Sequence, residues 1–153
     1  MKLIIVAVGK THDVLFKDAV DVFSSRIERY FVCEWKYVGA SKRDGESQKK
    51  EEGDAILKTL ETSDFVVLLD ERGKSLSSMD FSQFFERQML ASTKRLVFII
   101  GGAFGVSAEV LKRANSTISL SRMVFPHQLV RLILVEQLYR AISIIKGEKY
   151  HHE

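Results

Sequence analysis

The chain has 153 residues, of which 46% are hydrophobic and 28% are charged, a composition that excludes a disordered chain and predicts one domain spanning residues 1–153. Its formal net charge of +3 permits binding to nucleic acid without requiring it. A single cysteine excludes an intramolecular disulfide and a zinc site built on paired thiolates, and short apolar runs without an export signal predict a soluble protein of the reducing cytoplasm.

The first half of the chain alternates between strand and helix patterns. Residues 2–8 are predicted to form a buried strand, and apolar residues at helical spacing predict a helix over residues 14–30. Alternation around Trp35 predicts a half-buried strand, in which Cys33 is a small buried hydrophobe without a catalytic role. A polar surface loop is predicted at residues 39–46, before a charged helix.

Three further strands are predicted at residues 65–69, 96–100 and 117–120, each separated from the next by a helical segment. Short strands that are apolar on both faces predict an α/β fold with a mostly parallel sheet flanked by helices. In such sheets, ligands bind beyond the carboxyl ends of the strands. The last helix is opened by Pro126 and is apolar on most sides as far as Ile145, so we expect part of it to pack against a second subunit.

A glycine-rich turn, Gly101-Gly102-Ala103-Phe104-Gly105, connects the strand at residues 96–100 to a helix capped by Ser107. Glycines let backbone amides approach a ligand closely, so this turn suits a nucleotide-like ligand. A tight turn without any ligand explains the same residues equally well.

The triplet Gly73-Lys74-Ser75, in a loop predicted at residues 70–75, has the form of the end of a P-loop. The first glycine of a P-loop would stand at Leu68, inside a strand, so this phosphate cradle is excluded. The turn at residues 101–105 also lacks the spacing of a dinucleotide-binding motif.

The C-terminal residues Tyr150, His151 and His152 allow three interpretations. A disordered end is the default, contact with an RNA base is the second, and metal ligation is the weakest because the histidines lack ligand spacing. Basic residues elsewhere are candidate contacts for RNA phosphates, although interspersed acids favour a solvated loop: Lys42, Arg43, Lys49 and Lys50.

Three segments, residues 68–74, 99–102 and 119–150, together resemble the RlmH family of ribosomal RNA methyltransferases over nearly the whole chain. The most specific motifs are Phe125-Pro126-His127, Glu136-Gln137-Leu138-Tyr139-Arg140-Ala141 and Tyr150-His151. The resemblance implies an α/β fold of the SPOUT type with a C-terminal trefoil knot, and a homodimer. It also implies methyl transfer from S-adenosylmethionine to N3 of a pseudouridine in a stem-loop of 23S rRNA, on assembled ribosomes.

The resemblance also implies a cofactor pocket made largely by backbone groups, with apolar side chains packed on the adenine. Its lining residues are expected to be Leu69, Gly101, Leu120, Ser121, Arg122, Met123, Val124 and Phe125. The tail departs from the family pattern, because His152 and Glu153 stand where a basic residue is common.

On the RNA side of the site we expect Arg140, Tyr150 and His151, with positive charge from Arg131 or Arg140 favouring the deprotonated base. The sulfonium is already activated, so the reaction needs neither a metal nor a covalent intermediate. An i,i+4 ion pair with Glu136 is an equally good explanation of Arg140.

Two other functions stay open. The chain could be a SPOUT enzyme with a different RNA target, or a non-catalytic ribosome-associated module whose glycine turn and last helix serve only folding and pairing.

Overall fold

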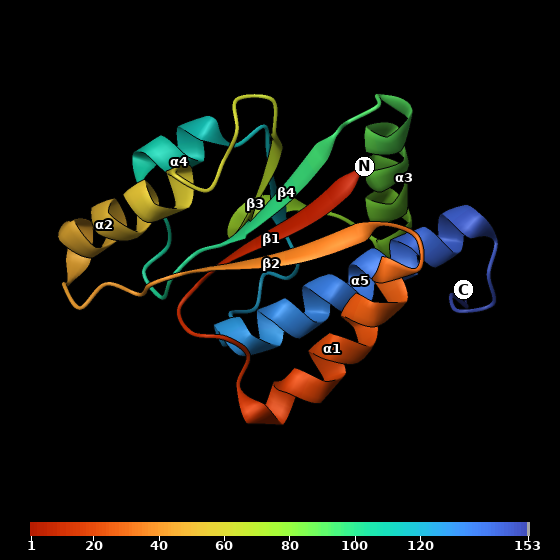
Figure 1. Ribbon diagram of the computed structural model, residues 1–153, viewed down its shortest axis with the longest axis horizontal. Coiled ribbons are helices and arrows are strands. Elements are labelled where there is room, and N and C mark those ends of the chain that lie inside the picture. The colour runs from red at the N-terminus through yellow and green to blue at the C-terminus, as the bar shows by residue number, and fades with distance from the viewer. Residues whose placement is uncertain (153) are drawn as a thin grey trace.

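A computed structural model describes residues 1–152, in which five helices surround one five-stranded sheet of order β2-β1-β4-β3-β5 (Figure 1). The elements are β1 (Lys2–Val8), α1 (Val14–Glu28), β2 (Val32–Val38), α2 (Gly45–Leu57), β3 (Phe65–Ser75), α3 (Ser78–Leu90), β4 (Arg95–Ile100), α4 (Ala108–Arg113), β5 (Ser116–Ser119) and α5 (His127–Lys146). Every neighbouring pair of strands is parallel, which confirms the predicted fold class. The knot stays an implication of the family resemblance.

Two hydrophobic cores lie on opposite faces of the sheet. In β1, Leu3 and Ile5 point into the core shared with α1, α3 and α5, whereas Ile4 and Val6 point into the core shared with α2 and α4. Figure 1 shows these two helical layers on either side of the strands. The central strands are buried on both faces, and this is why their sequences are continuously apolar.

Helix α5 packs on the sheet beside α1 and α3 and buries one apolar face within its own chain. Leu134, Val135 and Leu138 are fully buried there. Leu129, Ile133 and Ile144 are only half-buried and are not part of this core, so the expectation that part of α5 packs against a second subunit stays a prediction. No helix in the part of the chain that the structure describes is both long enough and apolar enough to cross a membrane.

Strand β3 continues through residues 70–75, where the sequence predicted a loop, and that prediction was wrong. The strand shifts its register against β5, so that Leu69 and Lys74 both pair with Ile118. A Cβ on Gly73 would lie 2.8 Å from the Ile118 backbone. Gly73 is thus required by the close approach of two strands, and the P-loop-like triplet has a structural explanation.

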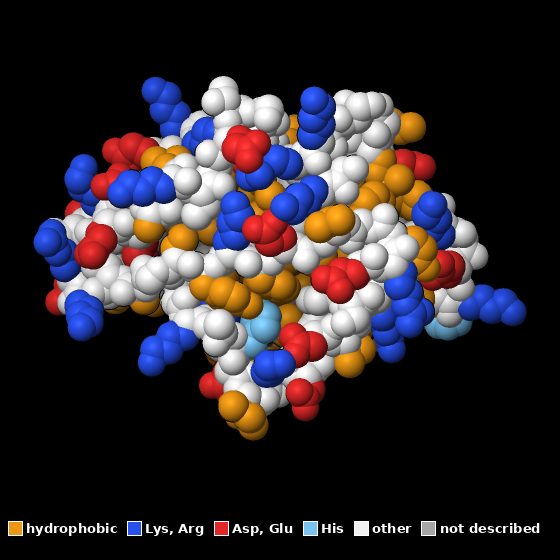
Figure 2. All heavy atoms as spheres, viewed as in Figure 1, with side chains coloured by type: hydrophobic (Ala, Val, Ile, Leu, Met, Phe, Trp, Pro, Cys, Tyr) orange, Lys and Arg blue, Asp and Glu red, His pale blue; other side chains and the backbone are white. Residues whose placement is uncertain are grey.

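The polar segment expected at residues 39–46 is a loop as far as Asp44, and α2 begins at Gly45. Over α2, Lys and Arg side chains alternate with Asp and Glu, and they do not form a patch of one sign (Figure 2). Lys49 pairs with Glu46 at 3.0 Å and Arg43 lies 3.7 Å from Glu51. This pattern agrees with a solvated surface.

Candidate functional site

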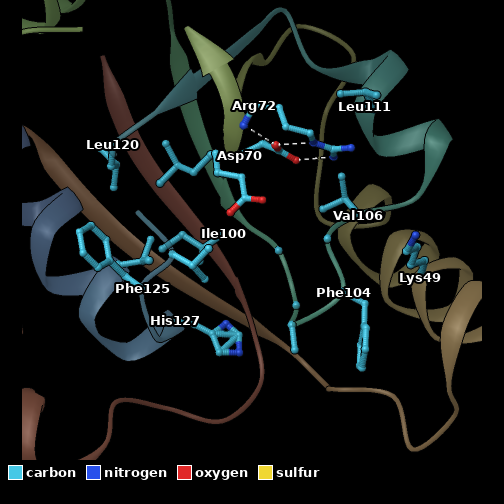
Figure 3. Close-up of a pocket in the computed structure, with 18 of the residues that line it drawn as sticks. Lys49, Asp70, Arg72, Ile100, Phe104, Val106, Leu111, Leu120, Phe125 and His127 are labelled. Atoms are coloured by element: carbon cyan, nitrogen blue, oxygen red, sulfur yellow. Dashed lines mark hydrogen bonds and ion pairs between the residues drawn. The ribbon is translucent and has the colours of Figure 1, made fainter. Parts of the chain in front are cut away.

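A pocket of about 840 Å³ lies at the carboxyl edge of the sheet, where the segments that end or follow β3, β4 and β5 meet (Figure 3). The three segments are residues 69–72, 100–106 and 120–127. Parallel strands place their carboxyl ends at one edge, so segments far apart in sequence converge there. The volume lies in the range of sites for small ligands and cofactors.

Seven of the eight residues predicted to bind the cofactor line this pocket: Leu69, Gly101, Leu120, Ser121, Met123, Val124 and Phe125. The eighth, Arg122, is exposed and does not line it. The segment before α5 is shaped by serine side chains, because Ser119 Oγ donates to Ser121 O at 2.8 Å and Ser121 Oγ accepts from Met123 N at 2.9 Å.

The pocket lining mixes polar and apolar groups, and some of its large apolar side chains are exposed. Met123 is 72% exposed, and Val124 and Phe104 are also open to solvent. A flat aromatic ligand would cover these groups, and burial of apolar area stabilises a complex by roughly 25 cal/mol per Å².

One side of the pocket carries an ion pair that the sequence analysis missed. Arg72 donates from Nε to Asp70 Oδ1 at 2.9 Å and from Nη2 to Asp70 Oδ2 at 2.7 Å (Figure 3). The Arg72 guanidinium holds the pKa of the Asp70 carboxyl below its usual range, so this carboxylate is ionised at neutral pH. The sequence analysis interprets residues 70–75 only as an excluded P-loop, and their spacing does not predict an ion pair between Asp70 and Arg72.

The glycines of the turn are explained by close packing. A Cβ on Gly101 would lie 2.7 Å from Val106 Cγ1, and one on Gly102 would clash with Glu52 Oε2. Gly105 has a φ of +84°, which favours glycine. The tight-turn interpretation therefore accounts for these glycines, although the same turn also lines the pocket.

Glu52 on α2 is the buried carboxylate behind this turn, and it is only 3% exposed. Its Oε1 accepts from Ser41 N at 3.0 Å and from Gln48 Nε2 at 3.1 Å. Glu52 thereby ties the loop before α2 to the wall of the pocket.

Substituting Gly102→Ala is expected to destabilise the fold by about 1 to 2 kcal/mol, because the added methyl group must displace a held side chain. In a Glu52→Ala background the same change should cost less than about 0.5 kcal/mol, since the obstructing carboxylate is gone. Urea denaturation measures both values. Gly39→Ala is the matched control, because nothing lies within 4 Å of a Cβ there. Equal costs in the two backgrounds would show that Glu52 does not constrain the turn.

The predicted RNA-facing residues form a second cluster, at the far end of α5. Arg140 donates to Glu136 Oε1 from Nε at 3.0 Å and from Nη2 at 2.6 Å, and its Nη1 lies 3.3 Å from His151 Nδ1. Tyr150 donates to Glu136 Oε1 at 3.0 Å, and the Arg140 guanidinium lies 4.7 Å from the Tyr150 ring centre. We call Glu136, Arg140, Tyr150 and His151 the tail cluster.

The tail cluster bears on two expectations from the sequence. Tyr150 and His151 pack against α5, which contradicts a disordered end up to His151. The structure contains the i,i+4 ion pair between Arg140 and Glu136, which the sequence analysis gave as the alternative to a role of Arg140 in RNA binding.

Within one chain, the tail cluster and the pocket are separate. His127 lines the pocket, and Arg140 follows 13 residues later in α5, about 20 Å along the helix axis at ~1.5 Å per residue. The structure therefore brings three of the four predicted catalytic residues together, Arg140, Tyr150 and His151, but does not bring them to the pocket of the same chain.

Arg131, the fourth predicted catalytic residue, is buried between α5 and β1 and is 1% exposed. It donates to Lys10 O at 2.8 Å and to Val8 O at 3.1 Å, and it lies 5.5 Å from the centre of the Tyr37 ring. Among residues 1–152 it forms no salt bridge, and its Nε has no hydrogen-bond partner. Arg131 therefore supports the fold, and it belongs to neither the pocket lining nor the tail cluster.

Cys33, the one cysteine of the sequence, lies in β2. Burial raises the pKa of the Cys33 thiol to about 12, so this side chain stays protonated and is a poor nucleophile. Within residues 1–152, no three His, Cys, Asp or Glu side chains gather in a way that could hold a metal ion.

Comparisons with known proteins agree with this geometry. A family model described as "Predicted SPOUT methyltransferase" matches residues 1–151. Several curated relatives carry the name "Ribosomal RNA large subunit methyltransferase H". The one from Christiangramia forsetii is 46% identical over 156 residues, with 99% of each chain covered. Those from Porphyromonas gingivalis and Parabacteroides distasonis are 45% and 43% identical over 157 residues, with 100% of each chain covered.

Proposed function

Because the chain belongs to the SPOUT methyltransferase family, we propose that it is a single-domain enzyme that transfers a methyl group from S-adenosylmethionine to a base of large-subunit ribosomal RNA. The observation that carries this proposal is the convergence of three segments, at Leu69, at Gly101 and at residues 120–125, into one pocket.

The residues of the pocket fit this donor. Leu69, Leu120 and Phe125 offer apolar surface to an adenine ring, and the backbone of residues 101–105 and 120–125 can read its edges. The carboxylate of Glu71 also lines the pocket, where it favours a cationic ligand, whereas the neighbouring Asp70 carboxylate is paired with Arg72. The bound donor supplies a methyl group that its sulfonium has already activated, so the chain has to orient the acceptor and take up its proton.

The acceptor we propose is N3 of a pseudouridine in a stem-loop of 23S rRNA, within assembled ribosomes in the cytoplasm. The relatives' name specifies large-subunit ribosomal RNA, and the finer assignment follows from the resemblance of the motifs. Arg140, with Tyr150 and His151 beside it, supplies a cation and an aromatic ring suited to an ionised base.

The separation of pocket and tail cluster supports a homodimer. If each pocket is completed by the tail cluster of a second copy, two halves that lie about 20 Å apart in one chain meet in the assembly. Val14 and Leu15, each 87% exposed at the start of α1, add uncovered apolar surface that pairing could bury.

One chain offers little unpaired positive charge for binding RNA phosphates, because Arg43 and Lys49 near α2 are paired with acidic residues. Two chains double this charge, and the ribosome adds contacts beyond the target loop. Protein-free RNA hairpins are therefore expected to be poorer substrates than ribosomes.

Calorimetry with S-adenosylmethionine tests the pocket. We expect the wild-type chain to bind the donor, and Ala103→Trp, which places an indole in the pocket lining, to weaken binding about tenfold or more, equal to about 1.4 kcal/mol. Val32→Trp, an exposed site at the start of β2, is the control and should bind normally. Absence of donor binding by the wild type would favour a non-catalytic module.

Mass spectrometry of ribosomal RNA from cells with and without the gene tests the acceptor. The expected result is loss of one methyl group at a pseudouridine of 23S rRNA in cells that lack the gene. A modification missing from another RNA would identify a SPOUT enzyme with a different target.

A further inference from the structure

His127, the first residue of α5, is the one histidine that lines the pocket among the residues the structure describes. Figure 3 shows its imidazole on the α5 side of the pocket, across from Phe104. The ring is half-buried, forms no hydrogen bond within residues 1–152, and has no nitrogen sealed from solvent. A free imidazole nitrogen therefore remains available to a ligand in the pocket.

The surroundings of His127 keep this imidazole neutral. Burial and the positive charge of Arg131, four residues further along α5, lower the pKa of His127 below its usual value of 6.5. Other charged or titratable groups on neighbouring segments are Lys10, His12 and Asp13 before α1, Asp70, Glu71 and Arg72 in β3, and Glu46 and Lys49 on α2. At neutral pH, His127 can thus accept a proton.

The other candidate bases are engaged or weaker. Asp70 is held by Nε and Nη2 of Arg72, and His151 Nδ1 lies against Arg140 in the tail cluster. Glu71 lines the pocket as a carboxylate, which is a weaker base than an imidazole.

We propose that His127 accepts the proton that the target base loses on methylation, an inference that rests on the proposed function. The N–H bond of the base breaks and its electron pair stays on nitrogen, which forms the new bond to the methyl carbon. The carbon–sulfur bond of the donor breaks and its electron pair stays on sulfur. The proton moves to the free nitrogen of His127, and the resulting imidazolium, destabilised by the Arg131 charge, releases it to solvent.

The test compares His127→Gln with the wild type in donor binding, turnover on ribosomes and pH dependence. We expect kcat to fall about 100-fold, the usual contribution of a general base, while donor affinity changes less than about twofold. The wild-type rate should rise with pH up to the pKa of His127 and then level off, and this rise should be lost in the variant. Added imidazole should restore turnover to His127→Ala. If His127→Gln fails to fold, His127→Ala replaces it in the test.

The protein without substrate provides a readout that does not depend on activity. In an NMR titration, the His127 imidazole should titrate below pH 6.5, and Arg131→Met should move its pKa upward. His12→Gln is the matched control for turnover. Burial and Arg131 also lower the pKa of His12, but His12 does not line the pocket, so this variant should keep the wild-type rate and pH profile.

The outcomes separate the two proposals. If the wild-type chain neither binds the donor nor methylates RNA, the proposed function fails. If it does both and His127→Gln keeps its kcat and the rise with pH, the proposed function stands and the role of His127 is wrong. If Glu71→Gln removes the rise with pH instead, the proton acceptor is Glu71 and the inference is overturned.

Discussion

Arg140→Ala is expected to lower methylation of ribosomes about 100-fold at saturating donor and substrate, with donor affinity unchanged. The guanidinium lies in the tail cluster against Tyr150 and His151, and it supplies the positive charge proposed to stabilise an ionised base. Its ion pair with Glu136 contributes only about 0.5 kcal/mol to stability, so the variant should remain folded.

Arg87→Ala, an exposed arginine on α3, is the matched control for Arg140 and should retain full activity. Turnover and urea denaturation are measured on both variants. If Arg140→Ala methylates ribosomes at the wild-type rate, Arg140 has no catalytic role. Its function would then be the ion pair with Glu136 on the helix surface.

Mixing two impaired variants, at a donor concentration too low to load the weakened Ala103→Trp pocket, tests whether the pocket and the tail cluster act across a dimer. Arg140→Ala keeps an intact pocket, and Ala103→Trp keeps an intact tail cluster. After the subunits exchange, half of the dimers are mixed and each has one complete site, so about a quarter of wild-type activity should return. No recovery despite exchange would show that each chain acts with its own tail cluster.

Arg131→Ala is expected to destabilise the chain by about 3 kcal/mol. The buried carbonyl of Val8 loses its donor at about 1 to 3 kcal/mol, the partly buried Lys10 O loses its donor at a smaller cost, and a cavity remains beside Tyr37. Removing a buried charge that has no acidic partner offsets part of this loss.

Arg131→Met should be less destabilising than Arg131→Ala, because it fills the space and also removes the buried charge. Urea denaturation orders the three proteins. If Arg131→Ala kept wild-type stability and lost only methylation, Arg131 would be the catalytic cation that the sequence suggested.

The layered fold could be predicted from the amino-acid sequence, because local periodicity decides which faces of an element are apolar. Continuous apolar runs marked β1 and β4 as strands buried on both sides, and strand–helix alternation required a parallel sheet between two layers. The resemblance to a known family identified seven residues of the pocket lining, and His127 stood in one of the family motifs without being assigned a role.

The contacts of individual side chains became known only from the three-dimensional structure. Gly102 meets Glu52, Gly73 meets the backbone at Ile118, and Arg131 meets the end of β1. Each contact joins residues far apart in the chain, and no local pattern encodes it. The separation of the pocket from the tail cluster was also not predicted. Sequence motifs specify residue types and their spacing along the chain, but not distances in space. Because α5 is one continuous helix, this spacing places the two sites about 20 Å apart.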